Sequence, residues 1–355
     1  MSKKTTSAIT ALEEAHKIAF APFVFQSSVS LKKLGVLTLI FDYRKKGGLT
    51  IEELSNQLSI STYGLGVLLE IAESANIVEK TKEKYSLTKT GYFLNFDKTV
   101  AVNLNFTNDV CYEGLYHLND AIKNGKPEGL KVFGDWDTIY EGLSELEPET
   151  QNSWFEFDHH YSDGIFEEAL DYVFRSKPKT IFDIGCNTGK FTLQCLRANP
   201  TVALKLFDLP GQLNKALLAV EAAGFKDRVS GQPINWLLPN PEINGSPDTI
   251  WMSQFLDCFS ESEIVTILSA CVKTMSLDTE LIIVETFTDR QKFEKAKFAL
   301  EATSLYFTAL ANGTSKMYPS NVFKQLIEKA GLTVAEDHPL GDYHTLLVCK
   351  KVNNL

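Results

Sequence analysis

The chain has 355 residues, with 35 lysines and arginines against 45 aspartates and glutamates, so that its formal net charge is −10. This length is enough for two domains of ordinary size, and the acidic balance argues against a nucleic-acid partner held by bulk electrostatics. No run approaches the roughly 18 apolar residues of a membrane span. The start, residues 1–6, is basic but lacks the apolar segment of a secretory signal. The six cysteines form no C-x-x-C pair, so we expect free thiols, no metal site and a cytoplasmic protein.

The first hundred residues are predicted to form a helical domain. Apolar residues recur near helical spacing over residues 8–46, which indicates two helices. A capping box of Thr50 and Glu53 begins a third helix. Another helix covers residues 61–75, and a hairpin is expected over 77–87. Helix, turn, helix and hairpin in this order indicate a winged helix.

A winged helix suggests DNA binding, which has to be weighed against other uses of this fold. The helix at residues 61–75 would enter the major groove, yet its expected exposed positions include Glu70 and Glu73 and no arginine or lysine. Two carboxylates are poor neighbours for phosphates. We therefore expect residues 1–100 to be a dimerisation domain whose apolar helices pair with a second subunit.

Residues 101–178 are expected to be mostly helical and rich in aromatic side chains. The densest stretch is Trp154–Tyr161, which includes Trp154, Phe157 and Tyr161. Aromatic side chains at this density either pack in the core or wall an apolar pocket. We assign the segment as a helical linker that contributes to a substrate pocket.

From residue 179 to 355 the pattern alternates between strand and helix. Strands are expected at residues 180–184, 202–207, 228–231, 249–253, 281–287, 332–335 and 345–350. Helices are expected at residues 190–198, 211–223, 260–273 and 320–330, the last one capped by Ser320. This alternation predicts a Rossmann-like α/β domain with a mostly parallel sheet and antiparallel C-terminal strands.

The first strand of this domain ends in a glycine-rich turn. The sequence there is Asp183-x-Gly185-x-x-x-Gly189, and Asp208 closes the next apolar run about 20 residues later. A carboxylate before the first glycine would repel a pyrophosphate, but it suits a ligand with a cationic amino-acid tail. S-adenosylmethionine is such a ligand, and Asp208 would then hold its ribose hydroxyls. The alternative is a strand, turn and helix whose glycines serve turn geometry alone.

Beyond these residues, the chain resembles the small-molecule O-methyltransferases that carry an N-terminal winged-helix dimerisation domain. The resemblance covers nearly the whole chain. Its motifs are Asp183–Gly189, Phe207–Pro210, Leu256–Glu261 and Ala330–Leu332. The resemblance implies a homodimer and methyl transfer from S-adenosylmethionine to a phenolic or other aromatic small molecule.

Several positions depart from the family pattern. The family has Leu-His-Asp-Trp where this chain has Leu256–Phe259, so Asp257 occupies the position of the histidine that deprotonates the phenol. Glu285 matches the family glutamate that steers this histidine. A second family glutamate aligns near Met317. The family acid that touches adenine aligns near Gln232, and a family lysine aligns with Ser253.

The resemblance therefore implies three sets of site residues. The catalytic candidates are Asp257, Glu285, His159 and His160. The cofactor candidates are Asp183, Gly185, Asn187, Gly189, Asp208, Leu209, Gln232 and Ser253. The substrate-pocket candidates are Trp154, Phe157, Tyr161, Met252, Phe255 and Met317.

The amino-acid sequences of two segments, 154–163 and 251–260, resemble those of a bacterial subgroup associated with aryl-polyene and flexirubin-type pigment pathways. An aromatic acceptor methylated on oxygen or on an activated ring carbon would follow. Two other readings stay open because the histidine and lysine are missing. One is a catalytically silent protein that binds adenosylmethionine or an aromatic ligand, and the other is an enzyme of the same fold that uses adenosylmethionine without transferring methyl.

Overall fold

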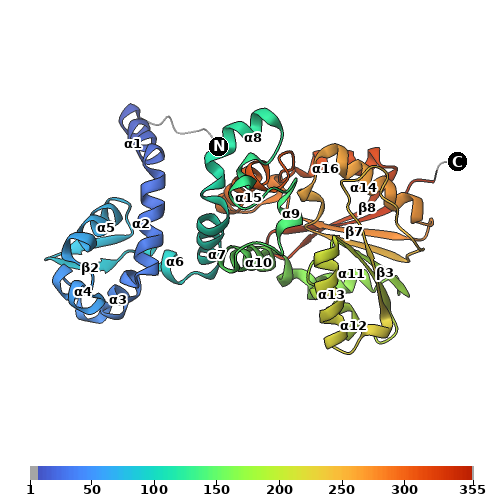
Figure 1. The fold of residues 1–355 in the computed structure, drawn as a ribbon, viewed down its shortest axis with the longest axis horizontal. Coiled ribbons are helices and arrows are strands. Elements are labelled where there is room, and N and C mark those ends of the chain that lie inside the picture. The colour runs from blue at the N-terminus through green and yellow to red at the C-terminus, as the bar shows by residue number, and fades with distance from the viewer. Residues whose placement is uncertain (1–6, 354–355) are drawn as a thin grey trace. The chain divides into compact units, whose positions relative to one another are not determined.

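The computed structural model describes residues 7–353. These residues divide between Asn108 and Asp109 into two compact units (Figure 1). The expectation about a leader concerns residues 1–6, which lie outside the described residues. The expected linker segment is divided between the units, since residues 101–108 belong to the first and 109–178 to the second.

The first unit is helical apart from one hairpin. Its helices are α1 (Ala8–Ala19), α2 (Ala21–Lys33), α3 (Val36–Asp42), α4 (Ile51–Leu58), α5 (Thr62–Ser74), α6 (Lys89–Phe96) and α7 (Lys98–Phe106), with the hairpin β1 (Val78–Thr81) and β2 (Lys84–Leu87). The prediction of two helices over residues 8–46 was wrong, because there are three. Gly35, with φ 75°, begins α3 after a turn that ends α2. The capping box of Thr50 and Glu53 and the antiparallel hairpin are confirmed.

The first part of the second unit is built of short helical segments. They are η3 (Gly114–His117), α8 (Leu118–Asn124), η4 (Glu128–Val132), α9 (Ile139–Gly142), α10 (Pro148–Ser162), η5 (Asp163–Ile165) and α11 (Phe166–Val173), and the π-helical turn Thr107–Cys111 precedes them. This agrees with the mostly helical character expected of the segment. The aromatic stretch Trp154–Tyr161 lies within α10.

A seven-stranded sheet forms the centre of the second unit. Its strands are β3 (Thr180–Ile184), β4 (Ala203–Asp208), β5 (Val229–Pro233), β6 (Thr249–Ser253), β7 (Glu280–Glu285), β8 (Leu332–Leu340) and β9 (His344–Lys351). Their order across the sheet is β5-β4-β3-β6-β7-β9-β8. The first five are parallel, and β9 is antiparallel to β7 and β8. The predicted Rossmann-like sheet with antiparallel C-terminal strands is confirmed.

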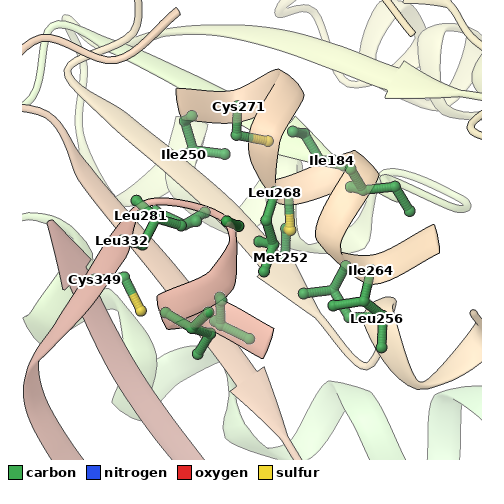
Figure 2. Packing of buried hydrophobic residues seen from close by; sticks show 14 of the residues in the cluster. Ile184, Ile250, Met252, Leu256, Ile264, Leu268, Cys271, Leu281, Leu332 and Cys349 are labelled. Carbon is green, nitrogen blue, oxygen red and sulfur yellow. The ribbon is translucent and has the colours of Figure 1, made fainter. Parts of the chain in front are cut away.

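Helices cover both faces of this sheet. The remaining ones are α12 (Lys190–Ala198), α13 (Pro210–Ala222), α14 (Glu261–Thr274), α15 (Glu294–Tyr306) and α16 (Ser320–Lys329). One core lies under α11, α12 and α13, and the other lies under α14 and α16 (Figure 2). Burial of this apolar area is the main stabilising term of the unit.

Two details of these helices differ from expectation. Helix α15 was not predicted, because its sequence contains many charged residues and its apolar residues show only a weak helical periodicity. Helix α16 is not capped by Ser320. Its first amide and the hydroxyl of Ser320 both donate to the carboxylate of Asp289, at 2.8 Å each. A distant carboxylate thus satisfies the helix N-terminus.

The described residues offer little for a membrane span or a metal site. Within residues 7–353 no single helix has the length and apolar character to cross a membrane, although α2 and α3, bent by 61°, pass such a test as a pair on length and composition. No group of three or more metal-binding side chains was found in the same residues. All six cysteines are free thiols.

Candidate active site

The candidate site lies at the carboxyl edge of the sheet, between β3 and β6. From β3 the chain continues to β4 and β5 on one side, and it returns to place β6 on the other side of β3. Loops that leave neighbouring parallel strands in opposite directions separate at such a switch point, which is where open α/β sheets bind ligands. The turn after β3 and the turn after β6 therefore form the two walls of the site.

Two glycines allow the turn after β3 to approach its neighbours closely. Gly185 has φ 74°, and a Cβ atom there would lie 2.4 Å from the ring of Phe255. Gly189 has φ 79°, and a Cβ atom there would lie 3.2 Å from Ala216 of α13. Both positions require the left-handed conformation that glycine adopts without strain. The glycines thus bring backbone amides to the edge of the sheet.

The carboxylate of Asp208 at the end of β4 holds this turn in place. It accepts hydrogen bonds from the amides of Asn187, at 2.8 Å, and Leu209, at 2.7 Å. The side-chain amide of Asn187 donates in turn to Asp158 of α10, also at 2.8 Å. Burial raises the pKa of Asp208 and of Asp158 to about 6. Helix α10, the turn after β3 and the end of β4 are therefore linked by one polar network.

Asp183 lies on the face of the sheet that α12 covers. Its side chain is 2% exposed and accepts a hydrogen bond from the hydroxyl of Thr192 in α12. Burial raises its pKa to about 7. The carboxyl group is therefore placed beneath the turn, where it fixes the start of α12.

Several buried polar atoms at this edge have no hydrogen-bond partner among the residues that the structure describes. They are Asn187 Oδ1, Thr188 Oγ1, Ser253 Oγ, Gln254 Oε1 and Glu285 Oε2. Buried polar atoms are nearly always paired, so a group of unpaired ones at the end of β3, β6 and β7 is typical of a ligand site. Carboxyl groups at the same edge could accept hydrogen bonds from an ammonium group and from ribose hydroxyls. Together with these unpaired polar atoms, they fit S-adenosylmethionine.

Glu285 at the end of β7 holds the turn that follows β6. Its Oε1 accepts from the amides of Phe255, at 3.3 Å, and Leu256, at 3.0 Å. These residues lead into the 3-10 turn η7 (Leu256–Cys258). The carboxyl group is 2% exposed. Burial is the main cause that holds its pKa well above the ordinary range, and the negative charge of the neighbouring Asp257 is the second. Glu285 is thus placed to position Asp257.

Asp257 lies in the middle of η7 and is 5% exposed. Burial raises its pKa to about 7, and the thiol of Cys258 donates to its Oδ1 at 3.5 Å. A carboxylate with an ordinary pKa is a weak base toward a phenol. Here desolvation supplies the basicity that the residue type alone lacks.

The two histidines of α10 have different surroundings. The ring of His159 stacks on Phe155, and its Nδ1 lies 3.3 Å from Asp163 and 3.7 Å from Asp158. His160 contacts the edge of Tyr161. His159 is therefore engaged by carboxylates at the rim, beside the network that joins α10 to the turn after β3.

The aromatic candidates on α10 contact other aromatic side chains. The indole of Trp154 donates to the hydroxyl of Tyr306 at 2.8 Å, and both side chains are buried. Phe157 and Tyr161 pack edge to face. Trp154 thus connects α10 to α15.

The remaining candidates are placed as follows. Met252 is fully buried in the core under α14, as Figure 2 shows. Phe255 packs against Trp236 and Phe259. Met317 accepts a hydrogen bond on sulfur from Thr286, at 3.7 Å. Both ends of the Gln232 amide bond the backbone of the loop at 242–244.

Two residues of this site were missed by sequence reasoning. Asp158 lies within the aromatic stretch of α10 and had no predicted role, and neither had Gln254, with φ 46°. An acidic residue in the middle of an aromatic helix is a signal that could have indicated Asp158. No sequence signal indicates the left-handed conformation of Gln254.

The comparisons with known protein families cover most of the chain. Residues 13–85 match the family described as Dimerisation2-like domain, and residues 115–333 match the O-methyltransferase domain. Among curated proteins, the phenazine O-methyltransferase PhzM of Lysobacter antibioticus is 24% identical over 266 residues, which are 74% of this chain and 75% of that protein.

Solved structures show the same architecture. The mitomycin 7-O-methyltransferase MmcR matches 96% of this chain and 98% of its own, with a TM-score of 0.72 and 17% identity. The O-methyltransferase NcsB1, solved with S-adenosyl-L-homocysteine and 1,4-dihydroxy-2-naphthoic acid, matches 92% and 96%, with a TM-score of 0.65 and 18% identity. These likenesses extend over both units and establish the fold.

Proposed function

The chain belongs to the O-methyltransferase domain family, and from this premise we propose that it transfers a methyl group from S-adenosylmethionine to the hydroxyl of a phenolic small molecule in secondary metabolism. The observation that carries the acceptor chemistry is the buried Asp257, whose pKa of about 7 suits a general base at neutral pH. The finer association with aryl-polyene and flexirubin-type pathways stays a prediction.

Different residues of the chain would bind different parts of the cofactor. Asp208 would hold the ribose hydroxyls, and the turn of Gly185 and Gly189 would face the amino-acid tail. Ser253 and Gln254, whose side-chain oxygens lack partners among the described residues, would offer further hydrogen bonds. When bound, S-adenosylmethionine supplies a methyl group on a sulfonium with a good leaving group, so positioning accounts for much of the rate.

The acceptor hydroxyl would be deprotonated by Asp257. Its carboxylate accepts the phenolic proton as the oxygen becomes nucleophilic, while Glu285 keeps η7 in place through the amides of Phe255 and Leu256. Glu285 does not need to ionise for this, because a neutral carboxyl oxygen also accepts from amides. Asp257 is thus the catalytic residue, and Glu285 is a positioning residue.

The function is tested by calorimetric titration of the purified protein, followed by a mass search. We expect micromolar binding of both S-adenosylmethionine and S-adenosylhomocysteine, and a product heavier by one methyl group when a panel of phenols is supplied. A deuterated methyl donor identifies the transferred group. Binding of both ligands without any methylated product across the panel would favour a ligand-binding protein, and binding of neither would contradict the cofactor site.

We further propose a homodimer that forms through the N-terminal unit. Residues 13–85 match a dimerisation domain family, and α1 buries none of its residues within the chain. Ile9 and Ile18 are 73% and 75% exposed. Exposed apolar side chains in one helix are typical of an interface.

The dimer is tested by light scattering on the eluting protein. We expect twice the 39.7 kDa mass of one chain. Replacing Leu12 and Ile18 together by aspartate should give monomers, because two charges would be desolvated in the interface. Replacement of the neighbouring Glu13 by glutamine is the control and should leave the dimer intact. A wild-type protein that elutes as a monomer at micromolar concentration would overturn the proposal.

A cytoplasmic location is also a proposal. Six free thiols suit a reducing compartment.

A further inference from the structure

Asn187 lies in the turn after β3, between Gly185 and Gly189, and its backbone is in the left-handed region with φ 49°. Asparagine adopts this conformation more readily than most side chains, but it is uncommon for any residue other than glycine. Two hydrogen bonds hold the residue there. Its backbone amide donates to Asp208 at 2.8 Å, and its side-chain amide donates to Asp158 of α10, also at 2.8 Å. Asn187 is thus fixed through both its backbone and its side chain.

The partner of the side-chain amide decides which way this group faces. An ionised carboxylate can only accept hydrogen bonds, so Asp158 takes the nitrogen end of the amide and not the oxygen end. Burial raises the pKa of Asp158 to about 6, which leaves the carboxylate ionised at neutral pH. The amide nitrogen lies 2.8 Å from it, whereas His159 Nδ1 is 3.7 Å away and nearer to Asp163, at 3.3 Å. Asp158 therefore sets the orientation of the Asn187 amide.

The oxygen end of the same amide is left for a ligand. Asn187 Oδ1 is buried and accepts no hydrogen bond within residues 7–353. An unpaired buried oxygen costs free energy that a donor on a ligand would recover. The turn that carries Asn187 is the part of the chain that would face the amino-acid tail of the cofactor. The ammonium of this tail has three N–H donors, whereas its carboxylate has none.

We propose that Asp158 is a positioning residue of the cofactor site, which fixes the Asn187 amide so that its Oδ1 accepts a hydrogen bond from the ammonium of S-adenosylmethionine. The inference rests on the cofactor site of the proposed function, and it is independent of the methyl acceptor and of methyl transfer. Asp158 belongs to α10 and Asn187 to the turn after β3. The affinity for the cofactor would therefore depend on a residue outside the glycine-rich turn.

The test is calorimetric titration of the full-length protein with S-adenosylhomocysteine, which carries the same amino-acid tail. Asp158→Ala removes the acceptor of the amide nitrogen and should weaken binding at least about fivefold, because the amide is then free to turn. Asp158→Asn keeps an oxygen that accepts from this nitrogen and should stay within about threefold of the original. Unchanged binding by Asp158→Ala overturns the inference. So does an equal loss in both variants, because the charge and not the hydrogen bond would then be responsible.

A double substitution shows whether Asp158 acts through Asn187. Asn187→Gly removes the amide but keeps a residue that adopts φ 49° without strain. It should weaken S-adenosylhomocysteine at least about fivefold, and adding Asp158→Ala should change the affinity by no more than about twofold. Losses that multiply, or an unchanged affinity in Asn187→Gly, contradict the inference. Asn187→Gly alone still decides if thermal unfolding shows that Asp158→Ala is not folded.

Two controls exclude other causes of a loss. Asp163→Ala removes a neighbouring carboxylate that bonds Lys190 and not Asn187, so the affinity should stay as it was. An equal loss there would make the general docking of α10 responsible. 5′-Methylthioadenosine has the adenine and ribose but no amino-acid tail, so Asp158→Ala should bind it unchanged, and an equal loss would assign Oδ1 to the nucleoside. Either result contradicts the inference. If the original protein binds no S-adenosylhomocysteine, the cofactor site of the proposed function fails, and the inference fails with it.

Discussion

Asp257→Asn should lower kcat at least about a hundredfold while leaving the dissociation constant of S-adenosylmethionine within about threefold of the original. General bases contribute 10²–10⁴ to rate, and asparagine keeps the shape of the side chain without accepting a proton. The structure places the carboxyl group in η7, which follows β6, whereas the ribose-binding candidate Asp208 ends β4. Rapid-quench methyl transfer and calorimetry measure the two quantities separately.

The pH dependence gives an independent check on the same residue. Since the base acts as the carboxylate, kcat/KM should rise with pH, reach half of its maximum near the pKa of about 7 that burial imposes on Asp257, and level off above it. The rising limb should be absent in Asp257→Asn, which has no carboxyl group to titrate. A variant with normal turnover, or one that keeps the rising limb, would show that Asp257 is not the base.

Glu285 supplies the matched control for this experiment. Glu285→Gln keeps an oxygen that accepts from Phe255 and Leu256, and it resembles the protonated form that the raised pKa favours. We expect it to retain most of kcat and the rising limb. Glu285→Ala leaves both amides without their acceptor and should lower kcat with little change in cofactor affinity. Equal loss in both variants would indicate that Glu285 itself titrates in the reaction.

The sequence predicted the α/β unit well because its signals are local. Thr180–Ile184 and Thr249–Ser253 are strands with the predicted bounds, since apolar runs between turn residues specify buried parallel strands. The division of residues 8–46 into three helices, and the helix α15, were not predicted. The break between α2 and α3 depends on one left-handed glycine, Gly35.

The site could be predicted in its residue types but not in its electrostatics. Asp208 and the glycines follow from motif spacing. The altered pKa of Asp257 depends on burial, which no local pattern reports. The sequence also does not show which side of the sheet Met252 faces, although residues adjacent in a strand face opposite sides. Met252 enters the core, while Ser253, next in sequence, reaches the edge with an unpaired hydroxyl.

Asp208→Ala should weaken the binding of S-adenosylmethionine more than tenfold, or more than about 1.4 kcal/mol. Hydrogen bonds from ribose hydroxyls to a carboxylate contribute about 1.5–3 kcal/mol, and alanine removes the acceptor. The same substitution frees the amides of Asn187 and Leu209, so the turn after β3 also loses its anchor. Both effects weaken binding in the same direction.

The two cofactor forms make this prediction specific. S-adenosylmethionine and S-adenosylhomocysteine carry the same ribose but differ in charge at sulfur, so Asp208→Ala should weaken both by the same factor. Asp208→Asn, which keeps one acceptor oxygen, should fall between alanine and the original. Thermal unfolding without ligand tells whether the variant is still folded. If a folded Asp208→Ala binds both ligands as before, the ribose lies elsewhere. If only S-adenosylmethionine is weakened, Asp208 acts on the sulfonium charge and not on the hydroxyls.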